Sequence, residues 1–147
     1  MRALSFPQID RFRGIAPLVL RGTMGVIFAY HGWQKFDNGL EGFKGFVDSL
    51  GVPLPEVLAP AAALLELVGG IMLLAGLLTR VVALLLAIQM VFTTILVKLD
   101  VGLIAGMGGG AGAEIDLALW SGMVALVLLG PGLFAIDRLI GIERQNV

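Results

Sequence analysis

Hydrophobic residues gather in four long stretches that short polar segments separate. The stretches run roughly over residues 14–34, 57–78, 81–97 and 115–136, and each approaches the roughly 20 apolar residues that cross a bilayer. The turn at Leu78, Thr79 and Arg80 is so short that the second and third helices must be antiparallel neighbours. The pattern predicts an all-α, integral membrane four-helix bundle, with residues 1–147 forming a single transmembrane domain.

The segment between the first two stretches has a different pattern. Leu40, Phe43, Phe46, Val47 and Leu50 recur at helical spacing, with charged residues on the other faces. This pattern predicts a short interfacial amphipathic helix over residues 40–50, lying on the outer leaflet and ending before two prolines.

Composition narrows the class of protein and of chemistry. Hydrophobic residues make up 58% of the chain and charged residues 14%, which excludes an ordinary soluble domain. The net charge of -1 argues against nucleic acid as a partner. The chain has no cysteine and one histidine, so we expect no thiol relay, no metal site and no covalent cofactor, and no catalytic residue is assigned.

The basic residues predict the orientation. Arginines cluster on the side that holds both termini and the turn between the second and third helices: Arg2, Arg11, Arg13, Arg80, Arg138 and Arg144. Only Lys35, Lys44 and Lys98 fall on the other side. Because positive loops stay in the cytoplasm, both termini are predicted to be cytoplasmic, in a multi-pass protein of the cell inner membrane.

Two ionisable residues lie within the predicted spans. Arg21 interrupts the first stretch and Glu66 the second, and each costs at least about 2.5 kcal/mol to insert unless it has a partner. One hypothesis is a buried ion pair that fixes how the two helices pack. The alternative is that Arg21 reaches the cytoplasmic headgroups and Glu66 is protonated.

A second polar group is expected at the outer ends of the helices. His31 and Lys35 are one turn apart in the first helix, and Glu114 and Asp116 begin the fourth. These residues could line a vestibule, capped by the amphipathic helix and Trp120, which would suit a ligand with carbonyls on an apolar body, such as a quinone. For Lys35 and Asp116 a solvated rim is the favoured interpretation. Gln89 adds hydrogen-bonding capacity from the third helix.

The order of these landmarks resembles the DoxX family over nearly the whole chain. The matching features are Arg21, the run His31-Gly32-Trp33-Gln34-Lys35, Glu66 before Gly69-Gly70, the turn ending at Arg80, Gly112-Ala113-Glu114, and Gly130-Pro131-Gly132 before Asp137. The resemblance implies a four-helix inner-membrane protein associated with redox complexes. It also implies that the family's recurrent polar positions correspond to Arg21, His31, Lys35, Glu66, Arg80 and Glu114.

Two functions follow as expectations. The first is a quinone-interacting membrane subunit of an oxidoreductase complex, with Arg21, His31, Glu66 and Glu114 as the buried polar or quinone-binding residues and Lys35, Gln89 and Trp120 in support. Electrons would come from a redox partner protein, because the chain lacks redox side chains of its own. The alternative is a noncatalytic scaffold, bounded by membrane lipid, that recruits soluble redox enzymes. A transporter is less favoured, since four helices without a repeat would need a homo-oligomer.

Overall fold

The described part of the protein is entirely helical between its turns. The computed structural model describes residues 12, 14–99, 101–104 and 112–143. Its elements are α2 (Ile15–Asp37), α3 (Leu40–Ser49), α4 (Pro55–Ala75), α5 (Thr79–Thr93), a π-helical turn η1 (Thr94–Lys98), α6 (Ala113–Leu129) and the short α7 (Ile136–Leu139). The predicted all-α class is confirmed.

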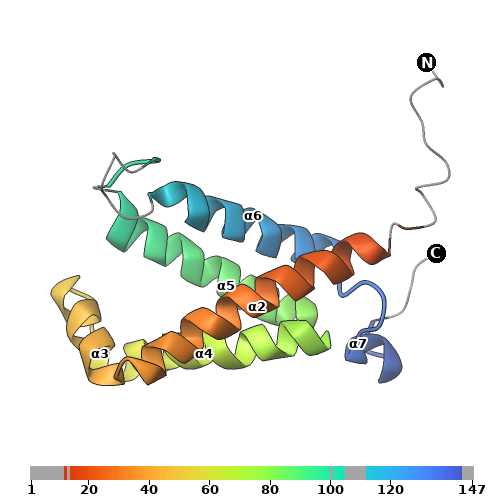
Figure 1. Ribbon diagram of the computed structural model, residues 1–147, viewed down its shortest axis with the longest axis horizontal. Helices are drawn as coiled ribbons and strands as arrows, with labels where there is room; N and C mark the ends of the chain where they lie inside the picture. The colour runs from red at the N-terminus through yellow and green to blue at the C-terminus, as the bar shows by residue number, and fades with distance from the viewer. Residues whose placement is uncertain (1–11, 13, 100, 105–111, 144–147) are drawn as a thin grey trace, which may run out of the picture.

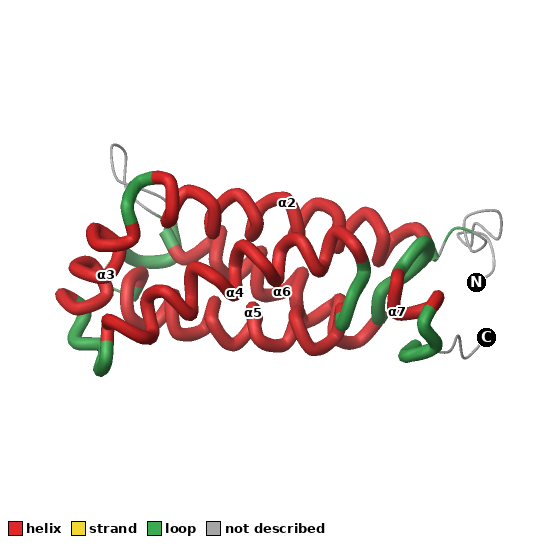
Figure 2. Tube along the Cα trace, turned by 90° about the horizontal axis from the view of Figure 1, so that it is seen from below, coloured by secondary structure: helices red, strands yellow, loops and turns green. Residues whose placement is uncertain are grey.

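The four long helices run side by side along the long axis of the molecule (Figure 2). α2 packs mainly along α4, and α5 mainly along α6. Figure 1 places α3 and α7 at opposite ends, which we call the α3 end and the α7 end. A hydrogen bond from the Leu133 amide to the Gly14 carbonyl puts the start of α2 at the α7 end as well.

Two helical segments are long and apolar enough to cross a membrane, namely α4 and the continuous stretch Thr79–Lys98. α2 has 23 residues but includes Arg21, and α6 has 17 residues. Length and composition therefore support two spans in the described residues. The predicted arrangement of four spans remains a prediction.

The fourth helix is shorter at its end than the predicted range 115–136. α6 ends at Leu129 because Gly130 has a φ of 80° and Pro131 cannot continue the hydrogen-bond ladder. The chain then turns back toward the bundle before α7. Similarly, α4 ends at Ala75, where Gly76 adopts a left-handed φ of 68°.

Glycines set the close approach of α2 to α4. A Cβ atom at Gly70 would overlap the backbone nitrogen of Ala29, and one at Gly32 would overlap the backbone of Leu67. The two helices therefore touch backbone to backbone in the manner of small-residue membrane interfaces. This contact brings the end of α2 that carries Lys35 beside the middle of α4.

The predicted amphipathic helix is present as α3, which lies against the start of α4. Lys44 of α3 pairs with Glu41, 2.8 Å away, and with Glu56 of α4, 2.5 Å away. The hydrogen bonds to Glu41 and Glu56 raise the pKa of Lys44 above its ordinary value. An exposed ion-pair cluster thus helps to tie α3 to the bundle, and its position at a membrane interface remains a prediction.

The predicted orientation rests partly on residues outside the described range. Arg2, Arg11, Arg13 and Arg144 all belong to these residues. Arg80 and Arg138 are described, and both lie toward the α7 end. Cytoplasmic termini accordingly remain a prediction.

Candidate functional site

A buried carboxylate near the middle of the bundle forms the centre of a group of polar side chains. Glu66 lies on the same face of α4 as Ala59, Ala63 and Leu73, and only 5% of its side chain is exposed. Oε2 of Glu66 pairs with the ammonium of Lys35, and Oε1 accepts a hydrogen bond from Nε2 of Gln89. Three different helices therefore converge on one carboxylate, and we call Lys35, Glu66 and Gln89 the Glu66 centre.

Lys35 is a partly exposed member of this centre. Its side chain is 21% exposed, against 5% for Glu66. Its ammonium also lies 4.9 Å from the ring centroid of Phe43 in α3, a cation–π contact. Lys35 thus lies between the buried carboxylate and the amphipathic helix that covers this end.

Gln89 has one free hydrogen-bonding atom. A carboxylate only accepts hydrogen bonds, so the amide must present its NH2 group to Glu66. Oε1 of Gln89 is then left buried with no partner in the described residues. Thr93, one turn further along α5, donates its hydroxyl to the Gln89 carbonyl at 3.0 Å.

A second polar group lies nearer the α3 end, around Asp116. Asp116 is 8% exposed, and its Oδ2 is 3.5 Å from the Thr94 hydroxyl at the start of the π-helical turn. Lys98, the exposed His31 and Glu114 are close enough to act electrostatically on Asp116. One oxygen of Glu114, Oε2, is buried without a partner in the described residues. π-helical turns of this kind are often found at functional sites.

The hypothesis of a buried ion pair between Arg21 and Glu66 is wrong. The Arg21 guanidinium donates four hydrogen bonds of 2.5–3.0 Å to the carbonyls of Leu73, Leu74, Leu133 and Phe134. Arg21 therefore caps the negative C-terminal end of α4 and holds the loop after α6. Its partners lie at the α7 end, whereas Glu66 is seven residues before Leu73 on α4, about 10 Å away along the helix at 1.5 Å per residue.

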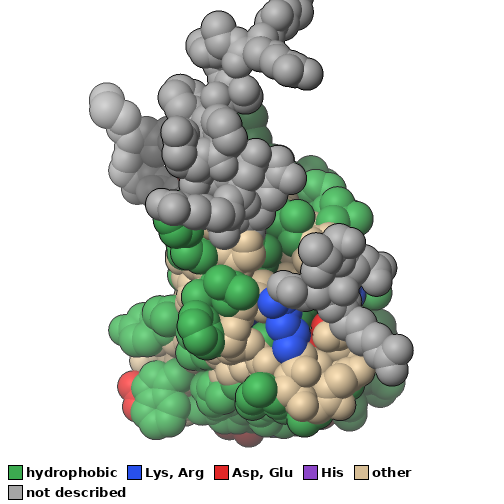
Figure 3. Space-filling model, turned by 90° about the vertical axis from the view of Figure 1, so that its right-hand side faces the viewer, with side chains coloured by type: hydrophobic (Ala, Val, Ile, Leu, Met, Phe, Trp, Pro, Cys, Tyr) green, Lys and Arg blue, Asp and Glu red, His purple; other side chains and the backbone are tan. Residues whose placement is uncertain are grey.

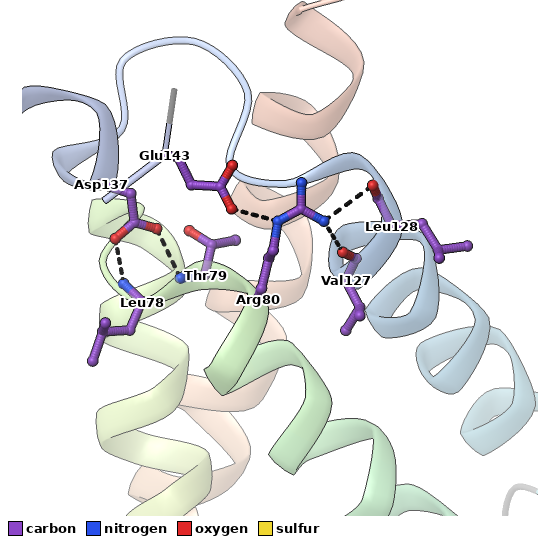
Figure 4. Close-up of polar contacts among 7 residues, drawn as sticks. All are labelled: Leu78, Thr79, Arg80, Val127, Leu128, Asp137 and Glu143. Atoms are coloured by element: carbon purple, nitrogen blue, oxygen red, sulfur yellow. Dashed lines mark hydrogen bonds and ion pairs between the residues drawn. The ribbon is translucent and has the colours of Figure 1, made fainter. Parts of the chain in front are cut away.

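Asp137 and Arg80 also cap helix ends at the α7 end of the bundle (Figure 4). Asp137, 1% exposed, accepts hydrogen bonds from the amides of Leu78 at 2.6 Å and Thr79 at 2.9 Å, and so caps the start of α5. Arg80 donates to the carbonyls of Val127 and Leu128 at the end of α6 and pairs with Glu143. Figure 3 shows a small area of basic side-chain atoms on this end of the molecule, bordered mainly by atoms of the other class.

Sequence comparison identifies the group to which these features belong. The sequence model of the DoxX family matches residues 16–99, which include the whole Glu66 centre. A Bacillus subtilis protein named "Putative oxidoreductase CatD" is 36% identical over 132 residues, 90% of this chain and 92% of its own.

The chain belongs to the DoxX family. Other relatives include the uncharacterized membrane protein Rv3486 of Mycobacterium tuberculosis, 31% identical over 92% of this chain and 88% of its own, and the inner membrane protein YqjF of Escherichia coli, 30% identical over 90% of this chain and 97% of its own. No solved structure matches. With these relatives and two apolar helices of spanning length, the predicted inner-membrane location is confirmed.

The other candidate residues of this DoxX protein do not lie as expected for the predicted vestibule. Lys35 and Asp116 were expected at a solvated rim, but Lys35 is only partly exposed and Asp116 is buried. His31, in contrast, is exposed. Trp120 is 39% exposed on the outside of α6, away from its buried face. Asp116 was missed as an interior residue, although its spacing from Ala113, Leu119 and Met123 follows the buried face of α6.

Proposed function

We propose that this DoxX-family protein is a quinone-interacting membrane subunit of an oxidoreductase complex, with the Glu66 centre as its site. The observation that carries the proposal is a carboxylate held inside an apolar bundle by a lysine and a glutamine from two other helices. Ionisable groups at this depth are costly, and they usually mark ligand or proton pathways. The relative named as an oxidoreductase supports a redox role.

The residues present fit a quinone headgroup in hydrogen-bonding terms. Lys35 and His31 are donors that suit carbonyl oxygens, and the unpartnered Oε1 of Gln89 is an acceptor that suits a hydroxyl of the reduced form. When bound, a quinone would supply the two-electron chemistry that the side chains of this cysteine-free chain lack. Glu66 would hold or release a proton beside the headgroup, and Lys35 would stabilise the carboxylate form.

The proposal includes a membrane arrangement and a partner. All four long helices cross the bilayer, with the α7 end and both termini on the cytoplasmic side and α3 on the outer leaflet. Arg21, Arg80 and Asp137 fix that cytoplasmic end and take no part in ligand binding. Electrons come from a separate redox protein that docks on the chain.

The test is the quinone content of the purified protein. The parent, Glu66→Gln and Glu41→Gln are purified in mild detergent, extracted with organic solvent and assayed for quinone by mass spectrometry. Glu41 is the matched control because its side chain is 86% exposed on α3. We expect near-stoichiometric quinone in the parent and the control, and loss in Glu66→Gln. Equal quinone in all three would refute the assignment.

The second candidate function is a scaffold, which the extensive capping at the α7 end favours. Arg21 and Asp137 are buried charged residues with a purely structural role, and the Glu66 centre could be structural in the same way. In that case no variant carries quinone, and cross-linking in membranes captures a soluble redox enzyme with Glu66→Gln as efficiently as with the parent.

A further inference from the structure

The interior of the bundle is divided into three layers along its axis. A capping layer at the α7 end contains Arg21, Thr79 and Asp137. A polar layer, which extends from the middle of the bundle to the α3 end and which we call the α3 half, contains the Glu66 centre and Asp116. Between them, the buried residues of the four long helices are all glycine or apolar: Gly25, Phe28 and Gly32 of α2, Gly69, Gly70 and Leu73 of α4, Val82, Ala83, Leu86 and Ala87 of α5, and Leu119, Gly122, Met123 and Leu126 of α6.

This apolar layer is tightly packed. Leu73, Leu86, Met123 and Leu126 are each 0% exposed, and Phe28 is 2% exposed. From Glu66 to Leu73 the layer is about 10 Å thick, at a rise of 1.5 Å per residue. Among the described residues, no polar side chain bridges it, so water and protons have no polar route from the α7 end to Glu66.

Toward the α3 end, by contrast, further polar side chains follow Glu66 and Gln89. Above Glu66 come Lys35, which is partly exposed, then Thr93 bonded to the Gln89 carbonyl, and then Thr94 beside Asp116. His31, which acts on Asp116, is itself exposed. Among the described residues, polar side chains therefore extend from the buried carboxylate toward the surface at the α3 end and not toward the α7 end.

Two orphan atoms support hydration of this half. Oε1 of Gln89 and Oε2 of Glu114 are buried acceptors with no partner in the described chain. Buried polar atoms are almost always satisfied, and ordered water is the usual partner where side chains provide none. The two other such atoms, Nε of Arg21 and Oγ1 of Thr79, belong to the capping layer on the far side of the apolar layer.

We infer that the α3 half is a one-sided, hydrated proton path that connects Glu66 with the aqueous phase at the α3 end. When the Glu66 carboxyl group loses its proton, the proton passes to water and leaves as hydronium on the α3 side, and the carboxylate keeps Lys35 as its counter-ion. Any reaction at the Glu66 centre would therefore exchange protons on that side of the membrane alone. The path involves the same carboxylate as the proposed function but does not depend on a quinone.

Thiol accessibility tests the path directly, because the chain has no cysteine. Thr93→Cys and Gln89→Cys place a thiol in the path, Ala83→Cys places one in the apolar layer, and Ile88→Cys places one on the lipid-facing surface of the same helix. The variants are reacted in membrane vesicles with a charged, water-soluble thiol reagent. Only a hydrated thiol can form the reactive thiolate, so we expect the path positions to react roughly 100-fold faster than the other two.

Sidedness is read against two exposed reference positions, Ser49→Cys at the α3 end and Leu139→Cys at the α7 end. Thr93→Cys should react from the vesicle side that labels Ser49→Cys and not from the side that labels Leu139→Cys. Labelling from the α7 side, or path positions as unreactive as Ala83→Cys, overturns the proposal. Quinone content is measured separately, so accessible path positions in a quinone-free protein would retain the path and reject only the quinone.

Discussion

Separate removal of the two charges of the Lys35–Glu66 pair should have unequal effects on stability. Lys35→Met leaves a carboxylate that is 5% exposed with only Gln89 as partner, and removing one partner of a buried pair typically costs about 3–5 kcal/mol. Glu66→Gln leaves an ammonium that is 21% exposed and still contacts Phe43. Its cost should be close to that of one charge-assisted hydrogen bond, about 1.5–3 kcal/mol.

The double variant, Lys35→Met with Glu66→Gln, should be destabilised by less than the sum of the two single variants, because neither charge is then left without its partner. We expect a coupling free energy of at least about 2 kcal/mol in a double-mutant cycle, measured by equilibrium unfolding in mixed micelles. Lys44 and Glu56 serve as the control pair: Glu56 is 73% exposed, and exposed pairs contribute little. A cycle in which Glu66 couples to Arg21 instead of Lys35 would refute the description of the site.

Three further predictions concern the frame around the site. Asp137→Asn weakens the cap at the start of α5 and should cost about 1–2 kcal/mol in the same unfolding assay, while Asp48→Asn on α3 should leave stability unchanged; equal effects would contradict the capping role. Because the folded-state pKa of Lys44 is raised, the contribution of Lys44 to stability is fully present below the ordinary lysine pKa of 10.5 and is lost as pH rises through the higher folded value. A fluorophore on α3 should report the release of this helix from α4 in that alkaline range. Release of α3 at neutral pH would be inconsistent with the ion-pair cluster. Gly70→Ala should cost about 1–3 kcal/mol or more, since a Cβ there overlaps α2, whereas Gly22→Ala, with nothing within 4 Å, should be neutral or stabilising; similar unfolding curves would argue against backbone contact.

Hydrophobic periodicity was sufficient for the helices but not for their ends. The α3 helix and the turn before α5 follow directly from apolar spacing and from a connection too short for any other arrangement. The end of α6 was misjudged because apolar residues continue past Gly130, and the backbone conformation of that glycine, not hydropathy, ends the helix.

The pairing of charges could not be predicted from depth alone. Arg21 and Glu66 were expected to meet because their side chains are long enough, but Arg21 finds two acceptor carbonyls at the end of α4 and two more in the loop after α6. These acceptors exist only once α4 has ended and the loop after α6 has folded back. Lys35, in contrast, lies three residues after Gly32 on the buried face of α2, so helical spacing could have indicated its inward position.

Infrared difference spectroscopy tests the central claim, that Glu66 handles protons beside a quinone. The protein is reconstituted in nanodiscs with quinone, which is reduced and reoxidised electrochemically, and spectra of the parent, Glu66→Gln and Glu41→Gln are compared. We expect a carboxyl-group band that follows the redox state in the parent and in Glu41→Gln and is missing in Glu66→Gln. A band that survives in Glu66→Gln, or no carboxyl band in the parent, would contradict it.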